Sequence, residues 1–431
     1  MPIRAHTLAL SPRALAGLAT FVALGSGCAR GDGDVAAPTT LDVELLATPA
    51  IPGSGEPRLS PAGADVVLSW LEPVSTKFDS SRAADRWRLR MVTLGDEGPW
   101  ETRTVAEGDR WFVNWADFPS VVRTPGGDLL AHWLQREGEG TYDYGVRVVR
   151  STDGGATWGE PWRPHEDAEA GEHGFVTLFP LADGGTGLVW LDGRRFAAGE
   201  EKMTLRARSL DRAGAPGAEV LVDDLICDCC QTDAAPTARG AVVVYRNRTE
   251  AEVRDIYTTS LSDGHWTEGR PVHADGWVIA ACPVNGPAVD ARGDDVAVAW
   301  FAAPGDSARV QVAFSKDGGV TFAPPSRVDG GNPGGRVDIT LLPDGSAVVL
   351  WIERNGEQGA EIRVRRVGAD GSLGAPALVA SSSAERASGF PRMASDGSGR
   401  LFFAWTDVSG PSPMIRLVRV AAAAVPPLVE R

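Results

Sequence analysis

Residues 66–70 read VVLSW, a short apolar strand that ends in tryptophan, and the same pattern returns six more times along the chain. The other copies are LLAHW at 129–133, TGLVW at 186–190, VVVY at 242–245, VAVAW at 296–300, AVVLW at 347–351 and LFFAW at 401–405. Their closing aromatic residues lie 51 to 63 residues apart. Such regular spacing is typical of a repeat protein, in which one supersecondary unit is copied around a single domain.

Each of these strands follows another short strand across a turn that contains Gly or Asp, which predicts seven hairpins. The preceding strands end at Pro61, Arg123, Phe179, Pro236, Val289, Thr340 and Ala394. A second pair of strand-like runs follows each hairpin, so the repeat contains four antiparallel strands. Such repeats are typical of β-propeller blades. We expect an all-β fold, a single β-propeller of four-stranded blades, with seven blades or, as the alternative, six.

The two ends of the chain predict how the ring of blades closes. The run LDVELL at 41–46 has no hairpin partner beside it, and the seventh unit has no clear fourth strand after its third strand at 414–419. We therefore expect the N-terminal strand to complete the seventh blade. Such pairing removes the open sheet edges of an unclosed ring.

Composition favours one turn-rich domain and argues against nucleic acid as a partner. Of the 431 residues, 43% are hydrophobic, which suffices for a packed core, and 51 glycines and 30 prolines indicate many turns. The formal net charge is -15. This charge disfavours nucleic-acid binding, because affinity for phosphate backbones depends on clustered Lys and Arg. An anionic ligand could still bind in a local basic pocket.

The first 28 residues have the order of an export signal. Arg4 and Arg13 precede an apolar run from residue 14 to residue 24, and small residues then precede Cys28. The run is shorter than the ~20 apolar residues of a membrane span. We predict a bacterial lipoprotein signal peptide with lipidation of Cys28. The alternative is an ordinary secretory signal with cleavage nearby.

These features divide the chain into three parts. We predict a signal peptide over 1–28, a flexible tether over 29–40 and the propeller over 41–431. The protein is then expected in the bacterial cell envelope, exported and lipid-anchored, in the periplasm or at the cell surface. Its contact with the membrane would be made by the lipid alone.

Two turns between predicted third and fourth strands carry a longer motif, STDGGATW at 151–158 and SKDGGVTF at 315–322. The Asp carboxylate can accept backbone N–H bonds within a tight turn, Gly permits positive φ, and the aromatic residue packs into the blade. We expect a purely structural role for the motif residues Asp153, Gly155, Thr157, Trp158, Asp317, Gly319, Thr321 and Phe322.

These turns resemble the Asp-box of bacterial neuraminidase repeats, and over residues 41 to 420 the chain resembles the sialidase-like superfamily of exported bacterial proteins. The resemblance implies a propeller fold. For a true sialidase it also implies an arginine triad that binds the substrate carboxylate, an Asp acid/base, and a Tyr nucleophile paired with a Glu. Sialidases have six blades, whereas seven hairpins are counted here, and other Asp-box propellers have other functions.

The resemblance gives candidates for the catalytic roles. Asp192 and Asp117 are candidates for the acid/base, and Tyr142 and Tyr144, with Glu137 or Glu139 nearby in sequence, are candidates for the nucleophile. The planar guanidinium group of arginine binds a carboxylate through two hydrogen bonds. The candidate ligand-binding arginines are Arg58, Arg194, Arg195, Arg246, Arg248, Arg336 and Arg392.

Four cysteines form a further candidate site. Cys227, Cys229 and Cys230 precede the inner strand of the fourth blade, and Cys282 precedes that of the fifth. Because these loops enter inner strands of adjacent blades, we expect them to meet on one face, with His173 nearby. Thiolates and imidazole suit copper(I) or zinc. An even number of cysteines in an exported protein equally suits two disulfides, and both interpretations stay open.

Three functions follow from these observations. The first is binding of an anionic carbohydrate, another envelope ligand or a metal ion at a top-face pocket built mainly by blades three to five, without glycosidase turnover. The second is a divergent exo-sialidase or related glycoside hydrolase. The third is a scaffold for a protein partner.

Overall fold

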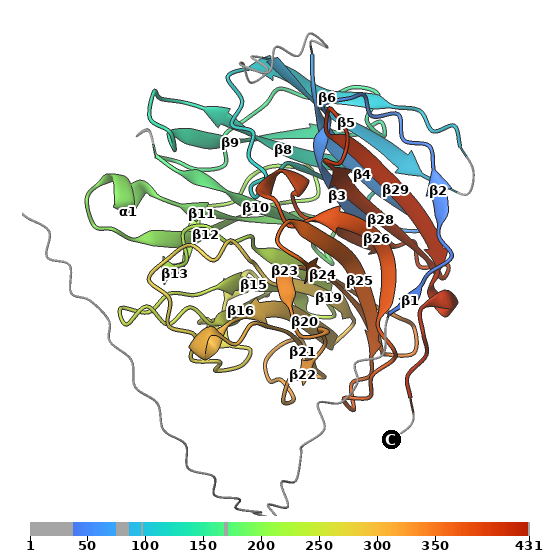
Figure 1. Ribbon diagram of the computed structural model, residues 1–431. Helices are drawn as coiled ribbons and strands as arrows, with labels where there is room; N and C mark the ends of the chain where they lie inside the picture. The colour runs from blue at the N-terminus through green and yellow to red at the C-terminus, as the bar shows by residue number, and fades with distance from the viewer. Residues whose placement is uncertain (1–37, 75–85, 96–97, 168–170, 430–431) are drawn as a thin grey trace, which may run out of the picture. The chain divides into compact units, whose positions relative to one another are not determined.

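The computed structural model describes residues 38–74, 86–95, 98–167 and 171–429, which are almost entirely β-strand (Figure 1). Residues 37–431 belong to one compact unit. The predicted signal peptide, Cys28 and residues 29–37 of the predicted tether lie outside the described residues. The α-helix α1 (Arg194–Ala197) is one short turn. Within the described ranges, no helix has both the length and the apolar character needed to cross a membrane.

The strands of the described residues form seven sheets, one for each predicted repeat. The inner strands are β3 (Gly55–Ala62), β7 (Ser120–Arg123), β10 (His173–Pro180), β14 (Asp233–Thr237), β19 (Ala288–Arg292), β23 (Pro333–Leu341) and β27 (Arg392–Ser395). The aromatic-ended second strands are β4 (Asp65–Pro73), β8 (Leu129–Arg136), β11 (Thr186–Asp192), β15 (Gly240–Arg246), β20 (Asp295–Ala302), β24 (Ala347–Asn355) and β28 (Arg400–Asp407). Every predicted hairpin is confirmed.

The outer half of each blade contains the third and fourth strands. The third strands are β5 (Arg86–Leu94), β9 (Tyr144–Ser151), β12 (Met203–Leu210), β16 (Ile256–Ser262), β21 (Arg309–Ser315), β25 (Gly359–Val367) and β29 (Met414–Ala421). The fourth strands are β6 (Arg103–Asp109), β13 (Val220–Ile226), β17 (His265–Trp266) with β18 (Arg270–Pro271), β22 (Ser326–Arg327), β26 (Ala377–Ser383) and β2 (Glu44–Leu46). In the second blade a single bridge between Val148 and Trp162 takes this place.

The N-terminal strand closes the ring, as predicted. β2 pairs antiparallel with β29 of the seventh blade, with Glu44 opposite Arg419 and Leu46 opposite Leu417, and Figure 1 shows the blue β2 beside the red β29. One step earlier in the chain, β1 (Thr39–Thr40) pairs parallel with β26 of the sixth blade. The last two residues of the predicted tether therefore belong to a sheet.

The hydrophobic core lies between neighbouring blades. The described residues contain seven buried apolar clusters, and each joins two adjacent blades. One cluster packs Leu68 and Trp70 of the first blade against Phe402 and Leu417 of the seventh, which seals the ring. Because Trp70 is fully buried, its replacement by Ala would cost about 3–5 kcal/mol of stability.

Aspartate side chains on or just before inner strands link neighbouring blades. Their carboxylates accept backbone N–H bonds from the inner strand of the next blade, over 2.7–2.9 Å. The donor and acceptor pairs are Phe175 to Asp117, Val289 to Asp233, Leu341 to Asp290 and Met393 to Asp338. Buried backbone donors need partners, so these carboxylates have a structural role at the seams between blades.

The two motif turns have the same hydrogen-bond pattern. In the first, Asp153 accepts bonds from the Thr157 backbone N–H at 2.9 Å and the Thr157 hydroxyl at 2.6 Å. In the second, Asp317 accepts the same two bonds from Thr321 at the same lengths. These donors lower the pKa of Asp317 to about 2 against the opposing effect of burial. Such local bonding suits a turn that fixes the ends of two strands.

Candidate functional site

The axial channel of the propeller contains a charge network that is paired internally. A cavity of about 300 Å³ is lined by residues from all seven inner strands. In its wall, Arg58 donates to Asp233 over 3.2 Å. Burial and the nearby Arg58 lower the pKa of Arg392 to about 9, whereas Asp338 and Asp233 act in the opposite direction. The positive charges expected to bind a ligand therefore face protein carboxylates.

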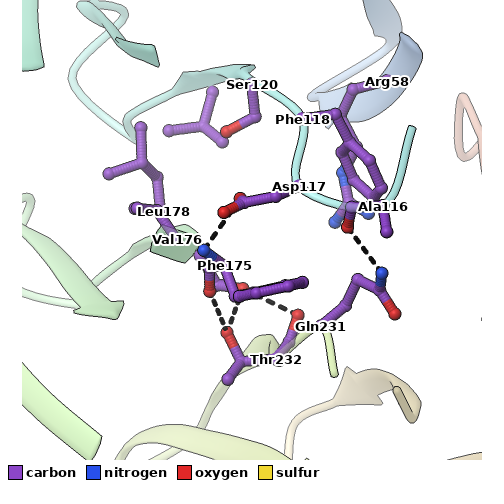
Figure 2. Close-up of a pocket in the computed structure, with 12 residues that line it drawn as sticks. Arg58, Ala116, Asp117, Phe118, Ser120, Phe175, Val176, Leu178, Gln231 and Thr232 are labelled. Carbon is purple, nitrogen blue, oxygen red and sulfur yellow. Dashed lines mark hydrogen bonds between the residues drawn. The ribbon is translucent and has the colours of Figure 1, made fainter. Parts of the chain in front are cut away.

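A second, smaller cavity adjoins this network (Figure 2). It measures about 20 Å³, which is room for about one water molecule. Aromatic rings pack beside it: Arg392 lies 4.4 Å from the ring centre of Phe118, and Trp115 stacks on Phe390 at 5.8 Å. This cavity is too small for a sugar ring.

The remaining candidate arginines are also engaged. Arg336 donates to the Ser388 hydroxyl and to the backbone carbonyls of Ala384, Glu385 and Gly389. Arg246 donates to three backbone carbonyls, those of Arg254, Asn285 and Phe301. Ion pairs hold the other three, namely Arg194 with Asp192, Arg195 with Glu200 and Arg248 with Glu252. The structure thus distributes the seven arginines over several separate networks.

Tyr144 lies between two carboxyl groups. Its hydroxyl is 3.0 Å from Asp117 Oδ2 and 3.0 Å from Glu172 Oε1. The ring is buried and stacks on Phe112 at 3.8 Å between ring centres. Gly174 permits this approach, since a Cβ atom there would lie 2.0 Å from Asp117 Oδ2. Two candidate catalytic residues, Asp117 and Tyr144, are therefore in contact, with Glu172 as an unforeseen third.

This cluster retains protons at neutral pH. One hydroxyl supplies one hydrogen, so both short contacts are full hydrogen bonds when one of the two carboxyl groups is protonated. Burial raises the pKa of Asp117 to about 7 and that of Glu172 to about 8, against the lowering effect of their hydrogen bonds. Burial and the two carboxylates raise the pKa of Tyr144 well above its usual value. The cluster is suited to sharing protons.

The other catalytic candidates lie elsewhere. Asp192 has no exposed surface and accepts the indole N–H of Trp190 at 2.9 Å in addition to its pairing with Arg194. Tyr142 is 57% exposed and lines a different pocket from Asp117. Glu137 pairs with Arg147 at 2.7 Å, and Glu139 pairs with Arg110. The roles assigned to these residues stay predictions.

A pocket of about 350 Å³, here called the thiol pocket, opens over blades two to four. Its lining residues are Tyr142, Asp143, Gly171, Glu172, Gly193, Phe196, Ala197, Met203, Asp228, Cys229 and Cys282. Three of them are carboxylic acids, and none is Lys or Arg. The expected top-face pocket over blades three to five is thus displaced by one blade, with Cys282 on the loop that leads into the fifth.

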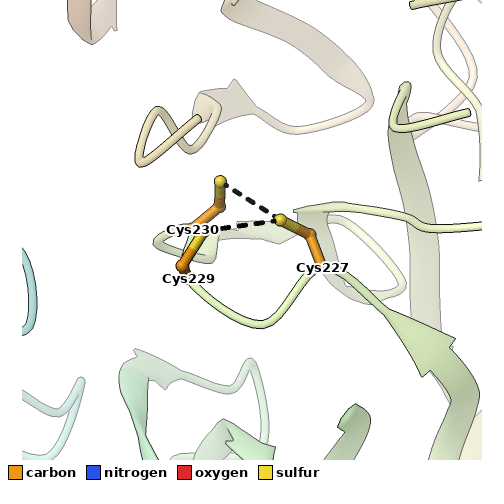
Figure 3. Close-up of side chains that lie close together, drawn as sticks. All are labelled: Cys227, Cys229 and Cys230. Atoms are coloured by element: carbon orange, nitrogen blue, oxygen red, sulfur yellow. Dashed lines mark hydrogen bonds between the residues drawn. The ribbon is translucent and has the colours of Figure 1, made fainter. Parts of the chain in front are cut away.

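The four cysteine side chains meet at this pocket as free thiols. Cys227 Sγ lies 3.5 Å from Cys230 Sγ and 3.8 Å from Cys229 Sγ, and Figure 3 shows these three sulfurs turned toward one another. The thiol of Cys229 also interacts with that of Cys282, which lies 3.7 Å from Asp228 Oδ1. The expectation that the two cysteine loops converge is therefore met in the structure.

Arg254 supplies positive charge beside the sulfurs. Its Nη1 lies 3.2 Å from Cys227 Sγ and 3.1 Å from Asp228 Oδ1. Burial raises the pKa of the Cys227 thiol, but bonds from Cys229 and Cys230 and the charges of Arg246 and Arg254 outweigh it, so the pKa is lowered. A thiolate is the form that binds metals.

His173 belongs to a different group from the cysteines. Its Nε2 lies 2.9 Å from Asp167 Oδ2, and its ring stacks on His165 at 3.9 Å between centres. Burial lowers the pKa of His173, but Asp167 and Asp192 raise it by more. His165, Asp167 and His173 form a separate set with metal-ligand spacing. Arg194 lies 3.4 Å from Asp167 in that set, so an ion-pair network accounts for it without a metal.

Sequence reasoning missed three residues of the two polar clusters: Glu172, Asp228 and Arg254. Asp228 lies within the CDCC stretch itself, so its place beside the cysteines could have been predicted. Glu172 contacts Tyr144, which lies 28 residues away in sequence. Arg254 contacts Cys227, which lies 27 residues away. No local pattern in the sequence marks such pairs.

Comparisons with known proteins support the fold alone. No family model and no curated protein matches the chain. Among solved structures, the polysaccharide lyase Uly1 is similar with a TM-score of 0.52 and 10% identity, over 88% of this chain and 91% of the lyase. At this identity the similarity identifies the fold and leaves the chemistry open.

Two further structures are similar at lower TM-scores. A protein of unknown function from Dyadobacter fermentans has a TM-score of 0.49 and 15% identity, over 88% of this chain and 98% of that one. The intramolecular trans-sialidase from Ruminococcus gnavus has a TM-score of 0.45 and 12% identity, over 73% of this chain and 95% of the enzyme.

Proposed function

We propose that this chain binds a soft metal cation, copper(I) or zinc, at the thiol pocket of an envelope-anchored propeller. The observation that supports the proposal is the convergence of Cys227, Cys229 and Cys230, whose sulfur atoms all lie within 4.8 Å of one another. Three sulfurs at the ~2.3 Å bond length of zinc thiolates lie roughly 3.8–4.0 Å apart around a shared ion. The 3.5 and 3.8 Å separations in the structure are close to that spacing.

The charge of the pocket favours a cation over an anionic sugar. Asp143 and Asp228 contribute carboxylates to its lining, Glu172 contributes a carboxyl group whose pKa burial raises to about 8, and no lining residue is Lys or Arg. Thiolate ligands select copper(I) and zinc over calcium and magnesium, which prefer oxygen. The expected anionic carbohydrate would meet repulsion here, and the arginines that would attract it are engaged elsewhere.

The backbone around the cysteines is held by buried hydrogen bonds. Arg246 joins the carbonyl of Arg254 to that of Asn285, three residues after Cys282. Gln231, which follows Cys230 directly, accepts the backbone N–H of Gly286 at 3.1 Å. The segment after Cys282 is thus tied to Arg246 and to Gln231, the residue that follows the CDCC stretch. A preorganised ligand set binds more tightly, because less ordering accompanies binding.

The test is metal binding by the full-length chain, purified without oxygen. Copper(I) and zinc are each titrated against a chromophoric chelator, and bound metal and free thiols are quantified in the same sample. We expect at least one tightly bound ion and its loss in Cys229→Ser. Met91→Leu, which removes a sulfur buried in the first blade, should bind as the wild type does. Absence of bound metal, or two disulfides in freshly isolated protein, would overturn the proposal.

Envelope anchoring is part of the proposal and rests on the signal order of residues 1–28. The basic residues, the apolar run and the small residues before Cys28 support lipidation. Growth with labelled fatty acid should label the protein in the membrane fraction, and Cys28→Ser should abolish the label. Label that persists in the variant would count against Cys28 as the anchor.

A second candidate function, glycoside hydrolysis, is favoured by the contacts of Tyr144. A Tyr in contact with Glu172 and Asp117 matches the residue types that the resemblance to sialidases implies. It ranks second because the Tyr144 ring is 1% exposed and because candidate arginines such as Arg246 and Arg336 already donate to protein groups. Release of a fluorophore from a sialoside, abolished by Tyr144→Phe, would support it. The scaffold function stays a prediction.

A further inference from the structure

The thiol pocket contains two sets of metal-ligand atoms that share one residue. The first set is Cys227, Cys229 and Cys230, and the second is Asp228, Cys229 and Cys282. Within each set the ligand atoms lie within 4.8 Å of one another, but Cys282 is not a member of the first set. A single ion bound by all four sulfurs would therefore require movement of the Cys282 loop.

We propose that the pocket holds two copper(I) ions joined by the sulfur of Cys229. This inference rests on the proposed metal-binding function and specifies its ligand. The inner ion is bound by Cys227, Cys229 and Cys230, and the outer ion by Cys229 and Cys282 with Asp228 as a weaker oxygen ligand. Each thiol that binds releases its proton to solvent.

The number of ligands favours copper(I) over zinc. Structural zinc sites have four ligands in tetrahedral geometry, whereas each set here supplies three ligand atoms. Thiolates are among the soft ligands that select copper(I). A sulfur atom with several lone pairs can serve two ions, which gives the central Cys229 its role. Two monovalent ions neutralise half of the negative charge of the four thiolates, and Arg254 supplies a further positive charge beside them.

The two sets differ in solvent exposure, and this difference predicts which set an ion meets first. Cys227 and Cys230 are each 1% exposed, whereas Cys282 is exposed and lines the pocket opening. An incoming ion therefore meets the outer set first and reaches the inner set through the half-buried Cys229. The outer set is the entry site and the inner set is the tighter site.

Arg254 connects the two sets electrostatically. The same nitrogen, Nη1, contacts Cys227 Sγ of the inner set and Asp228 Oδ1 of the outer set. Its charge is held in place by Glu252, which accepts from Arg254 Nη2 at 2.9 Å. The guanidinium group keeps Asp228 close to Cys282 and partly neutralises the inner thiolates. Both sets are thus kept assembled by one buried cation.

The test is the copper stoichiometry of the full-length chain under anaerobic conditions. Copper(I) is titrated in competition with a chromophoric chelator, and the copper-to-protein ratio is measured by elemental analysis. We expect two ions in the wild type and one in Cys282→Ser, with the tighter binding step retained. Cys230→Ser should lose the tighter step. X-ray absorption of the wild type should show a copper–copper distance that is missing in Cys282→Ser.

The outcomes separate this inference from the proposed function. One ion in the wild type would overturn the two-ion arrangement and leave metal binding intact, whereas no ion would overturn both. Two ions in Cys282→Ser would also overturn the arrangement. Because Cys282 is exposed, its replacement should leave the fold unchanged. Asp228→Asn is a second variant, and it should weaken the looser step alone by about tenfold.

Discussion

The axial channel and the thiol pocket both gather chemically reactive side chains, but they differ in how charge is balanced. In the channel, Arg58 pairs with Asp233, and Arg392 lies near Asp338. In the thiol pocket, thiols and carboxyl groups collect beside Arg254. Internal pairing suits a structural role, whereas an excess of one sign leaves room for a ligand of the opposite sign.

The largest expected effect concerns the paired charges of the axial channel. Asp233→Ala removes the partner of Arg58 and the acceptor of the Val289 N–H at once. Leaving a partly buried charge and a buried backbone donor without partners should lower the free energy of unfolding by about 3 kcal/mol. Urea denaturation measures this loss. Asp42→Ala, at an exposed position, should change stability by less than about 0.5 kcal/mol.

The next effect concerns Glu172, which lines the thiol pocket and contacts Tyr144. Burial raises its folded-state pKa from the ordinary 4.5 to about 8, so between these pH values the folded state holds a proton that the unfolded state loses. The contribution of Glu172 to the free energy of unfolding is then greatest below about pH 4.5 and is lost as pH rises through 8. Between pH 6 and pH 8 the wild type should lose about 2 kcal/mol relative to Glu172→Gln. Parallel stability curves for the two proteins would show that Glu172 ionises normally.

A smaller effect concerns Arg254, the cation beside the thiol pocket. Arg254→Gln removes the cation beside Cys227, so metal affinity should fall about tenfold, as is usual for partners of metal ligands. Arg248→Gln is the matched control, because Arg248 pairs with the same Glu252 but with none of the thiols. Chelator competition measures both affinities. Equal affinities in the two variants would show that Arg254 has no part in binding.

The smallest effect should leave both regions unchanged. Asp317→Ala removes the acceptor of two bonds from Thr321 in a partly exposed turn. Stability should fall by about 1 kcal/mol, the value of ordinary turn hydrogen bonds. Metal stoichiometry should equal that of the wild type. A loss of bound metal would mean that this turn affects metal binding at the thiol pocket, contrary to its expected structural role.

The sequence allowed the fold to be predicted almost completely, because the fold depends on local repetition. Apolar strands ending in Trp or Tyr recur at near-constant spacing, and each became the second strand of a blade. The closing strand was predictable from the unpaired run at 41–46. The convergence of Cys282 with the CDCC stretch followed from their equivalent places before adjacent inner strands.

The polar partnerships were much less predictable, because they depend on how loops of different blades pack. Glu137 and Glu139 are closer to Tyr144 in sequence, yet Glu172 is the residue that contacts it. His173 enters the ring close to the cysteines, yet Asp167 holds it in another group. The arginines were chosen by their places along the chain, but carbonyl groups that engage two of them come from distant segments.

The pairing of β2 with β29 has a consequence for the order of folding. Glu44 and Arg419, which face each other in this ladder, are 375 positions apart. Contacts so distant in sequence form late, because the entropy of a very long loop must first be overcome. β2 therefore leaves the ribosome long before its partner β29, and until the two strands pair, their open edges can join strands of other chains.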